Sequence, residues 1–134
     1  MNDVVTGEAP LRYLSDEWVA AADAGLADVP PLDTGVRIGF RVREGARSEA
    51  THDHVLVLGP LRTGIERGLD GAALTLSLDW DLAVSINRGE LSAQRAFLDG
   101  QILLDGDPSV LLGHQASLAA IDDRLADLRA RTSY

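Results

Sequence analysis

The residues with the clearest chemical potential form the segment His52-Asp53-His54. Two histidines two positions apart on a strand point to the same face, so they could bind zinc if His114 or an acid supplied a third ligand. Asp53 and His54 could instead serve as an acid–base pair in an enzyme. The simpler interpretation, which we favour, is that both histidines are half-exposed strand residues. We therefore expect no metal and no cofactor.

Other catalytic motifs are missing from the sequence. There is no cysteine, and all twelve basic residues are arginine. This composition excludes thiolate nucleophiles, Schiff-base lysines and a P-loop lysine. No Gly-x-Ser-x-Gly elbow is present, and the glycine-rich segments 68–71 and 100–106 lack nucleotide-binding spacing. Asp99, Asp105 and Asp107 do not follow a calcium-loop pattern and are interpreted as turn residues. The chain is not expected to be an enzyme.

Charge and composition limit the partners. The net charge of -9 over 134 residues disfavours nucleic acids and anionic membrane surfaces. No apolar run approaches the roughly eighteen residues of a membrane span, so no integral membrane association is expected. The first ten residues do not form a secretory signal, and the expected location is the cytoplasm. Arginine without lysine, with abundant Ala, Gly, Leu and Asp, suggests a GC-rich bacterial genome.

The first half of the chain predicts a helix followed by strands. Residues 1–10 are expected to be a flexible arm and residues 11–134 a single domain. A helix capped by Ser15 and ended by Pro30-Pro31 is predicted from an apolar stripe. The stripe consists of Leu11, Leu14, Trp18, Ala22 and Leu26. Strands are predicted at 36–43, 52–58 and 63–68.

The strand at 36–43 alternates between two kinds of residue. Val36, Ile38, Phe40 and Val42 are predicted to face the core. The other row, Arg37, Arg41 and Arg43, could bind an anionic head group, but a solvated sheet face is the favoured interpretation.

The second half predicts a strand at 73–78 and then helices. Ser77 is expected to cap a helix that stops near Gly89, and Ser92 to cap a second helix that ends at Leu98. A short strand at 101–105 and a long last helix from Pro108 follow. The apolar stripe of that helix is Leu111, Leu118, Ile121, Leu125 and Leu128. This order favours an α+β fold with helices on one sheet face.

Residues 74–107 carry a set of short motifs in a fixed order: Leu74-Thr75-Leu76-Ser77, Gly89-Glu90-Leu91, Ala96-Phe97-Leu98-Asp99-Gly100 and Ile102-Leu103-Leu104-Asp105-Gly106-Asp107. In these motifs the chain resembles the sterol carrier protein type 2 family, in its small bacterial single-domain form. The resemblance implies a five-stranded mixed sheet covered by helices, with an apolar tunnel between the layers. Leu103 departs from the pattern, because a polar residue usually stands there, and we expect the last helix or a partner subunit to cover it.

The resemblance further implies non-catalytic binding of a hydrophobic small molecule, such as a fatty acyl, sterol-like or other lipid. The predicted tunnel lining is Trp18, Ile38, Phe40, Leu76, Trp80, Val84, Phe97, Ile102 and Leu104. The helices between Ser77 and Leu98 are expected to move to admit the ligand. Two alternatives stay open: an interaction module or accessory subunit of a lipid or small-molecule enzyme, including a homodimer, and an enzyme that uses His54 and Asp53.

Overall fold

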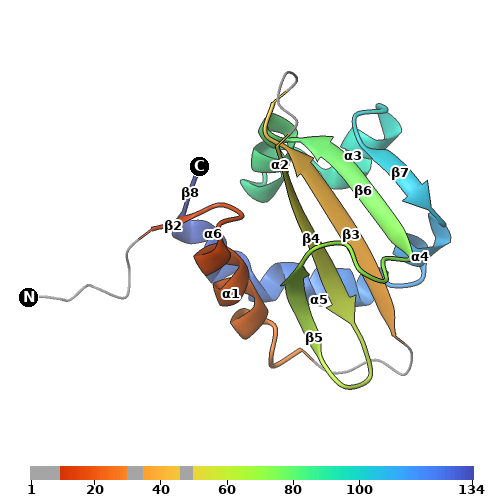
Figure 1. Ribbon diagram of the computed structural model, residues 1–134, viewed down its shortest axis with the longest axis horizontal. Coiled ribbons are helices and arrows are strands. Elements are labelled where there is room, and N and C mark those ends of the chain that lie inside the picture. Colours follow the sequence, from red (N-terminus) through yellow and green to blue (C-terminus); the bar gives the residue numbers. More distant parts are fainter. Residues whose placement is uncertain (1–9, 30–34, 46–49) are drawn as a thin grey trace, which may run out of the picture.

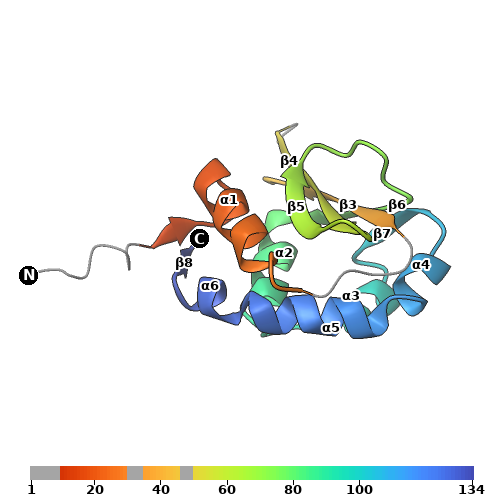
Figure 2. The ribbon, with the colours of Figure 1, turned by 90° about the horizontal axis from the view of Figure 1, so that it is seen from below.

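The computed structural model describes residues 10–29, 35–45 and 50–134, and its helices lie mainly on one side of a five-stranded sheet (Figures 1 and 2). The predicted arm at 1–10 falls outside these residues except for Pro10. The strands are β2 (Leu11–Arg12), β3 (Val36–Arg43), β4 (Thr51–Leu58), β5 (Thr63–Arg67), β6 (Leu74–Asp79), β7 (Leu103–Gly106) and β8 (Thr132–Ser133). The helices are α1 (Asp16–Gly25), α2 (Trp80–Asn87), α3 (Ala93–Leu98), α4 (Ser109–Leu112), α5 (Gln115–Arg124) and α6 (Ala126–Ala130).

The main sheet has the order β5-β4-β3-β6-β7. Strand β3 pairs antiparallel with β4 and parallel with β6, and the two outer pairs are antiparallel, so the sheet is mixed. A separate parallel pair joins β2 to β8, which brings together segments from opposite ends of the chain. The predicted α+β fold with a five-stranded mixed sheet is confirmed.

The first helix is shorter than its apolar stripe predicts. Ser15 caps α1 as expected, because its Oγ accepts a hydrogen bond from the amide of Trp18. Leu14 precedes the cap with a φ of 63°, and Leu11 lies in β2, so neither belongs to the helix. The helix ends at Gly25, before Pro30-Pro31, which lie outside the described residues.

Two predicted boundaries around β6 and β7 are wrong. Ser77 lies within β6, and the residue at the N-cap of α2 is Asp79, because β6 stays paired with β3 as far as Asp79. The strand β7 begins at Leu103 rather than residue 101. The amide of Gln101 is still engaged in ending α3, since it donates to the carbonyl of Ala96. Gly89 and Gly100 follow α2 and α3 at positive φ, and Gly89 lies at its predicted stop position.

The predicted long last helix is divided into α4, α5 and α6. His114 leaves helical geometry at φ -128° and ψ 24°, and its Nδ1 lies 2.8 Å from the carbonyl oxygen of Val110. Leu125 makes the second break, where Arg129 donates a hydrogen bond to the carbonyl of Asp122 at the end of α5. These breaks separate α5, which runs beneath the sheet, from α4 and α6 (Figure 2).

The Asp23 carboxylate attaches helix α1 to the backbone of the edge strand β5. Asp23 Oδ1 accepts a hydrogen bond of 2.9 Å from the amide of Ile65 and one of 3.0 Å from Arg62. The carboxylate therefore satisfies a backbone donor that an edge strand would otherwise present to water. This contact holds the helix that carries Trp18 over the sheet.

We predict that Asp23→Ala destabilises the protein by about 1–3 kcal/mol, because it removes a charge-assisted hydrogen bond to the backbone. Urea unfolding followed by circular dichroism measures the change. Asp28→Ala is the matched control, since Asp28 is highly exposed and its pair with Arg124 is 3.6 Å long. Equal losses in the two variants would contradict the assigned role of Asp23.

Candidate ligand-binding face

The sheet has an inner face that meets the helices and an outer face that does not. Because side chains alternate along a strand, Ile38, Phe40 and Val42 of β3 lie on the inner face and Arg37, Arg41 and Arg43 on the outer face. The strand register extends the inner face to both sides. Its three cross-strand rows are Leu56–Ile38–Leu74, His54–Phe40–Leu76 and His52–Val42–Leu78.

Eight of the nine predicted lining residues come together in one apolar cluster between the inner face and the helices. They are Trp18, Ile38, Phe40, Leu76, Trp80, Val84, Ile102 and Leu104. Phe97 is not part of this cluster and is 42% exposed on α3. These residues come together because strand alternation and the apolar stripes of the helices direct them to the same side. The role of these residues as a tunnel lining stays a prediction.

An aromatic group centred on Tyr13 closes one end of the cluster. The Tyr13 ring lies 5.1 Å from Trp18, 5.4 Å from Trp80 and 5.4 Å from Tyr134, measured between ring centroids. Burial raises the pKa of Tyr13, and the nearby Tyr134 adds to this effect. The Trp18 indole donates to Thr132 Oγ1 at 3.0 Å, so β8 is connected directly to α1.

Sequence reasoning missed Tyr13 and Tyr134 as members of this group. Tyr13 does not belong to any of the apolar patterns that predict a helix or a strand. Its ring contacts Tyr134, at the opposite end of the described chain. No local pattern signals such a contact, because it depends on the pairing of β2 with β8.

His54 is a buried polar residue on the inner face. Its ring stacks on Phe40 with centroids 5.2 Å apart and an interplanar angle of 13°. Burial first and the Arg67 cation second lower the pKa of His54 to about 4, against an opposing effect of Asp53. The imidazole is therefore neutral at neutral pH.

The proposed pairing of Asp53 with His54 does not form. Asp53 binds Arg41 through both carboxylate oxygens on the outer face, whereas His54 lies on the inner face. His52 lies 2.9 Å from Glu44 and is 26% exposed at its side chain, so it fits the expected half-exposed residue, but the buried His54 does not. Within residues 10–29, 35–45 and 50–134, no group of three metal-binding side chains is close enough to hold an ion.

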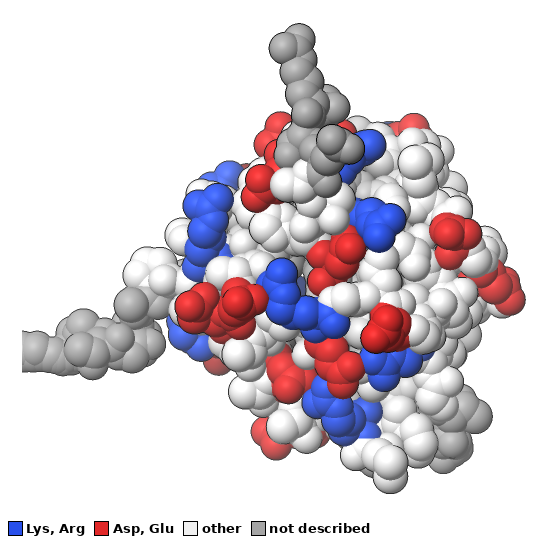
Figure 3. Space-filling model, in the orientation of Figure 1, with Lys and Arg blue, Asp and Glu red and all other residues white. Residues whose placement is uncertain are grey.

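The outer face is a network of ion pairs. Arg37, Arg41 and Arg43 pair with Glu66, Asp53 and Asp79, at distances between 2.7 and 3.2 Å. Arg37 and then Arg62 hold the pKa of Glu66 below its usual value through hydrogen bonds. Figure 3 shows the resulting mixture of both charges on this face. The arginine row is thus paired with acids, as a solvated sheet face permits.

The outer face also has a covered part, which strand alternation alone does not predict. Val55 is 1% exposed although it lies on this side of β4. Gly39 leaves space for the loop after β5, since a Cβ there would lie 3.0 Å from Leu69 Cδ2. The loop therefore packs over the middle of the sheet.

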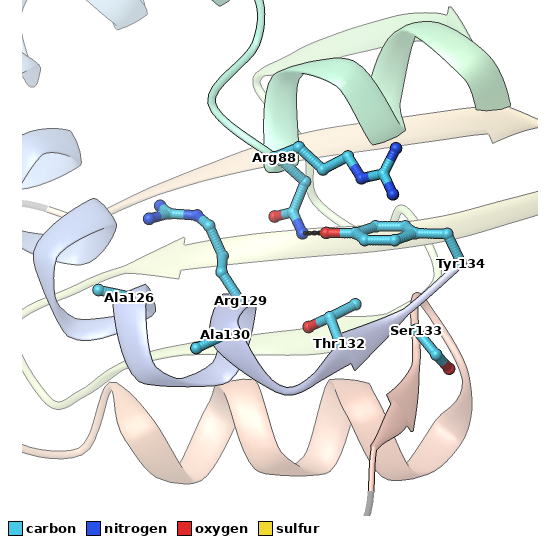
Figure 4. Close-up of a pocket in the computed structure, with 8 residues that line it drawn as sticks. Arg88, Ala126, Arg129, Ala130, Thr132, Ser133 and Tyr134 are labelled. Atoms are coloured by element: carbon cyan, nitrogen blue, oxygen red, sulfur yellow. Dashed lines mark hydrogen bonds between the residues drawn. The ribbon is translucent and has the colours of Figure 1, made fainter.

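A surface hollow of about 600 Å³ lies where β8, α6 and the end of α2 meet (Figure 4). The Asn87 amide donates to the Tyr134 hydroxyl at 2.6 Å, and the Arg88 guanidinium lies 5.0 Å from the Tyr134 ring centroid. Arg129 points away from Arg88, so the two guanidinium groups do not converge on one point (Figure 4). None of the nine predicted lining residues contributes to this hollow.

A smaller hollow of about 270 Å³ lies between the end of α1 and the start of β5. Thr63 lines it, and Thr63 Oγ1 is buried with no hydrogen-bond partner among the described residues. This hollow also contains none of the nine predicted residues.

Large apolar side chains are exposed around the β7 edge of the sheet. Leu98 on α3, Leu103 on β7 and Leu112 on α4 are 65–71% exposed. The last helix does not cover Leu103, so that part of the expectation is wrong. No helix in the described part of the chain is both long and apolar enough to cross a bilayer.

Comparison with known proteins identifies the architecture. No protein-family model and no curated protein sequence matches the chain. Among solved structures, a sterol carrier protein 2 aligns with a TM-score of 0.65 and 15% identity over 84% of this chain and 96% of that one. The chain has the sterol carrier protein 2 fold. The expectation drawn from the motifs at 74–107 is thereby confirmed for the architecture.

Two further structures with the sterol carrier protein 2 fold are similar. A conserved hypothetical protein of Thermus thermophilus has a TM-score of 0.64 and 17% identity, over 94% of each chain. Sterol carrier protein 2 of Aedes aegypti, solved with palmitate, has a TM-score of 0.55 and 21% identity over 82% of this chain and 98% of that one.

The burial of neutral His54 predicts a pH dependence of stability. The folded pKa of about 4 lies below the ordinary value of 6.5, so the unfolded chain binds more protons between these values. Stability should therefore be complete above pH 6.5 and fall by about 1.4 kcal/mol per pH unit as the pH approaches 4. Urea unfolding of wild type and His54→Phe across this range measures the difference.

The ionisable groups around His54 are Arg67, Asp53 and His52, with Asp16 of α1 paired to Arg67. These groups are present in both proteins, so subtracting the stability of His54→Phe from that of wild type at each pH leaves the contribution of His54. His114→Gln is the control and should keep the wild-type slope. An unchanged slope in His54→Phe would show that His54 is already protonated or solvent-accessible in the folded state.

Proposed function

We propose that the protein binds and carries a hydrophobic small molecule between the inner face and its helices, without catalysing a reaction. The observation that supports this most is the apolar cluster itself, which joins eight predicted lining residues from β3, β6, β7, α1 and α2 and the segment before β7. The palmitate complex of the Aedes aegypti protein, which has the same fold, is consistent with a lipid ligand. We further propose that the domain is a single unit in the cytoplasm of a bacterium.

The energetics favour an apolar ligand. Each methylene transferred from water gains about 0.8 kcal/mol, so a chain of about sixteen carbons has a gross driving force of about 12 kcal/mol before association costs. No charged anchor is needed for useful affinity. The net charge of -9 disfavours strongly anionic ligands and nucleic acids.

Ligand entry requires the cluster to open. Helices α2 and α3 are the elements proposed to move, because α2 contributes Trp80 and Val84 to the cluster and α3 contributes Ala96. Gly89 lies between the two helices and Gly100 follows α3, and both have positive φ.

Adjacent residues of β7 provide a matched test of the site. Leu104 packs against the cluster and Leu103 is 65% exposed on the other side of the strand. We predict that Leu104→Trp, which adds bulk within the site, weakens lipid binding at least about tenfold at a stability cost of about 1–3 kcal/mol. Native mass spectrometry with n-tetradecanol measures binding.

Leu103→Trp makes the same change on the exposed side and should bind as wild type does. Equal weakening by both variants would place the ligand elsewhere. If freshly purified wild-type protein carries no lipid and binds none of a panel of long-chain probes, the carrier proposal is refuted.

A second candidate is a protein-interaction role, which the exposed leucines near β7 favour. A short edge strand beside Leu98, Leu103 and Leu112 could join two copies or an enzyme of lipid or small-molecule metabolism. An enzyme that uses Asp53 with His54 is not proposed, since the two side chains lie on opposite faces of the sheet.

Sedimentation velocity tests the second candidate. If the leucines join two copies, wild type sediments as a dimer and Leu103→Glu as a monomer, because a buried carboxylate opposes association. Leu61→Glu is the control, since Leu61 is 96% exposed between β4 and β5, away from β7. A wild-type monomer at millimolar concentration counts against self-association.

A further inference from the structure

Thr63, at the start of the edge strand β5, is enclosed but incompletely hydrogen-bonded. The residue is only 4% exposed. Its Oγ1 is the one buried side-chain atom in the described part of the chain that has no hydrogen-bond partner there. Leaving a buried polar group unpaired costs about 1–3 kcal/mol, so such groups are rare in folded proteins. Thr63 therefore calls for a partner outside the described chain.

The backbone of Thr63 points away from β4. In an antiparallel pair, residues bonded across the pair alternate with residues whose amide and carbonyl point outward. The amide of Gly59 donates to the carbonyl of Arg62 across the turn, so the groups of Thr63, the next residue, point outward. Ile65 has the same phase, because its amide donates to Asp23. The amide and carbonyl of Thr63 thus lie at the free edge of β5, where no further backbone group of the described residues is bonded to them.

The hollow of about 270 Å³ lies at this point of the edge. Its apolar walls are Ala24, Ala27 and Val29 at the end of α1 and Leu61 in the turn before β5. The hollow is much larger than the share of one water molecule, which is about 30 Å³ in the liquid. Outward backbone groups beside space for an apolar side chain are the features that an added strand uses.

The surroundings limit how much of such a strand can pair with β5. Asp23 already occupies the amide of Ile65, so pairing cannot continue past Thr63 in that direction. In the other direction Leu61 is 96% exposed and offers an apolar contact. A partner segment can therefore make one pair of backbone hydrogen bonds, to Thr63, while a neighbouring residue of the segment packs on Leu61.

The residue placed opposite Thr63 directs its side chain to the same face of the sheet as Thr63, toward the end of α1. Threonine fits this position, because its hydroxyl can bond to Thr63 Oγ1 while its methyl group packs on Ala27 and Val29. The charged residues of the hollow, Asp23 and Arg62, are bound to each other at 3.0 Å. An uncharged side chain is thus accommodated without breaking an ion pair.

We propose that an extended segment of a partner protein adds to the free edge of β5, with a threonine opposite Thr63 whose side chain enters the hollow. The segment accepts a hydrogen bond from the amide of Thr63 and donates one to its carbonyl. None of the nine predicted lining residues contributes to this hollow. The inference is therefore independent of the carrier function.

The test uses blocked tripeptides as probes and follows the amide resonances of ¹⁵N-labelled wild type by NMR. Acetyl-Ala-Thr-Ala-amide should shift the amide resonance of Thr63, with a dissociation constant in the millimolar range. Acetyl-Ala-Val-Ala-amide has nearly the same shape but no hydroxyl, so it should bind about two- to tenfold more weakly, the range for one hydrogen bond. N-methylation of the threonine removes the donor to the Thr63 carbonyl and should abolish binding.

Variants assign the preference to the site. Thr63→Val keeps the shape and removes the hydroxyl, so the threonine and valine peptides should bind it equally. This variant should not lower stability in urea unfolding, because the hydroxyl that it removes is unpaired. Ala27→Phe fills the hollow and should abolish binding. Ala20→Phe is the matched control on an exposed position of α1 outside the hollow, and it should bind as wild type does.

Three results would overturn the proposal. If neither peptide shifts the Thr63 amide of wild type at millimolar concentration, the edge does not accept a strand and ordered water alone serves Thr63. If both peptides bind wild type equally, no hydroxyl pairs with Thr63 Oγ1. If Ala20→Phe and Ala27→Phe weaken binding equally, the peptide lies elsewhere. Lipid binding is measured separately and is unaffected by any of these results.

Discussion

The central strand β3 determines the two-sided chemistry of the molecule, because its apolar side chains alternate with arginines over eight residues, except at Gly39. Its apolar row must be buried, which requires helices on that side, and its arginines must stay near water and carboxylates. The neighbouring strands repeat this division, with Asp53 and Asp79 opposite arginines on one side and Leu56 and Leu76 on the other. The same strand register therefore produces both the apolar cluster on the inner face and the ion-pair network on the outer face.

Much of the fold could be predicted from local patterns. The alternation of residues 36–43 predicted β3, and Ser15 and Ser92 cap α1 and α3 as predicted. The errors arise where a distant contact overrides a local signal. Ser77 has the chemistry of a cap, but the pairing of β6 with β3 extends beyond it. The last helix has a continuous stripe, but breaks at His114 and Leu125 redirect the chain.

The candidate site was predictable only in part, for the same reason. Alternation and helix periodicity select the residues that face the core, and eight of the nine predicted ones do cluster. The burial of His54 could not be predicted, because a histidine on an alternating strand is equally compatible with either a half-exposed or an enclosed position. Its environment is set by α1, which Asp23 and Asp16 attach to β5 from about forty to fifty residues away in the chain.

The aromatic group has a practical consequence for studies of this protein. Both tryptophans of the chain, Trp18 and Trp80, contact the same Tyr13 ring, and both belong to the apolar cluster. Their intrinsic emission therefore arises wholly from the region between the helices and the inner face. Any guest that displaces these indoles, or any loosening of the β2–β8 pair, alters the emission spectrum without the need for an attached dye.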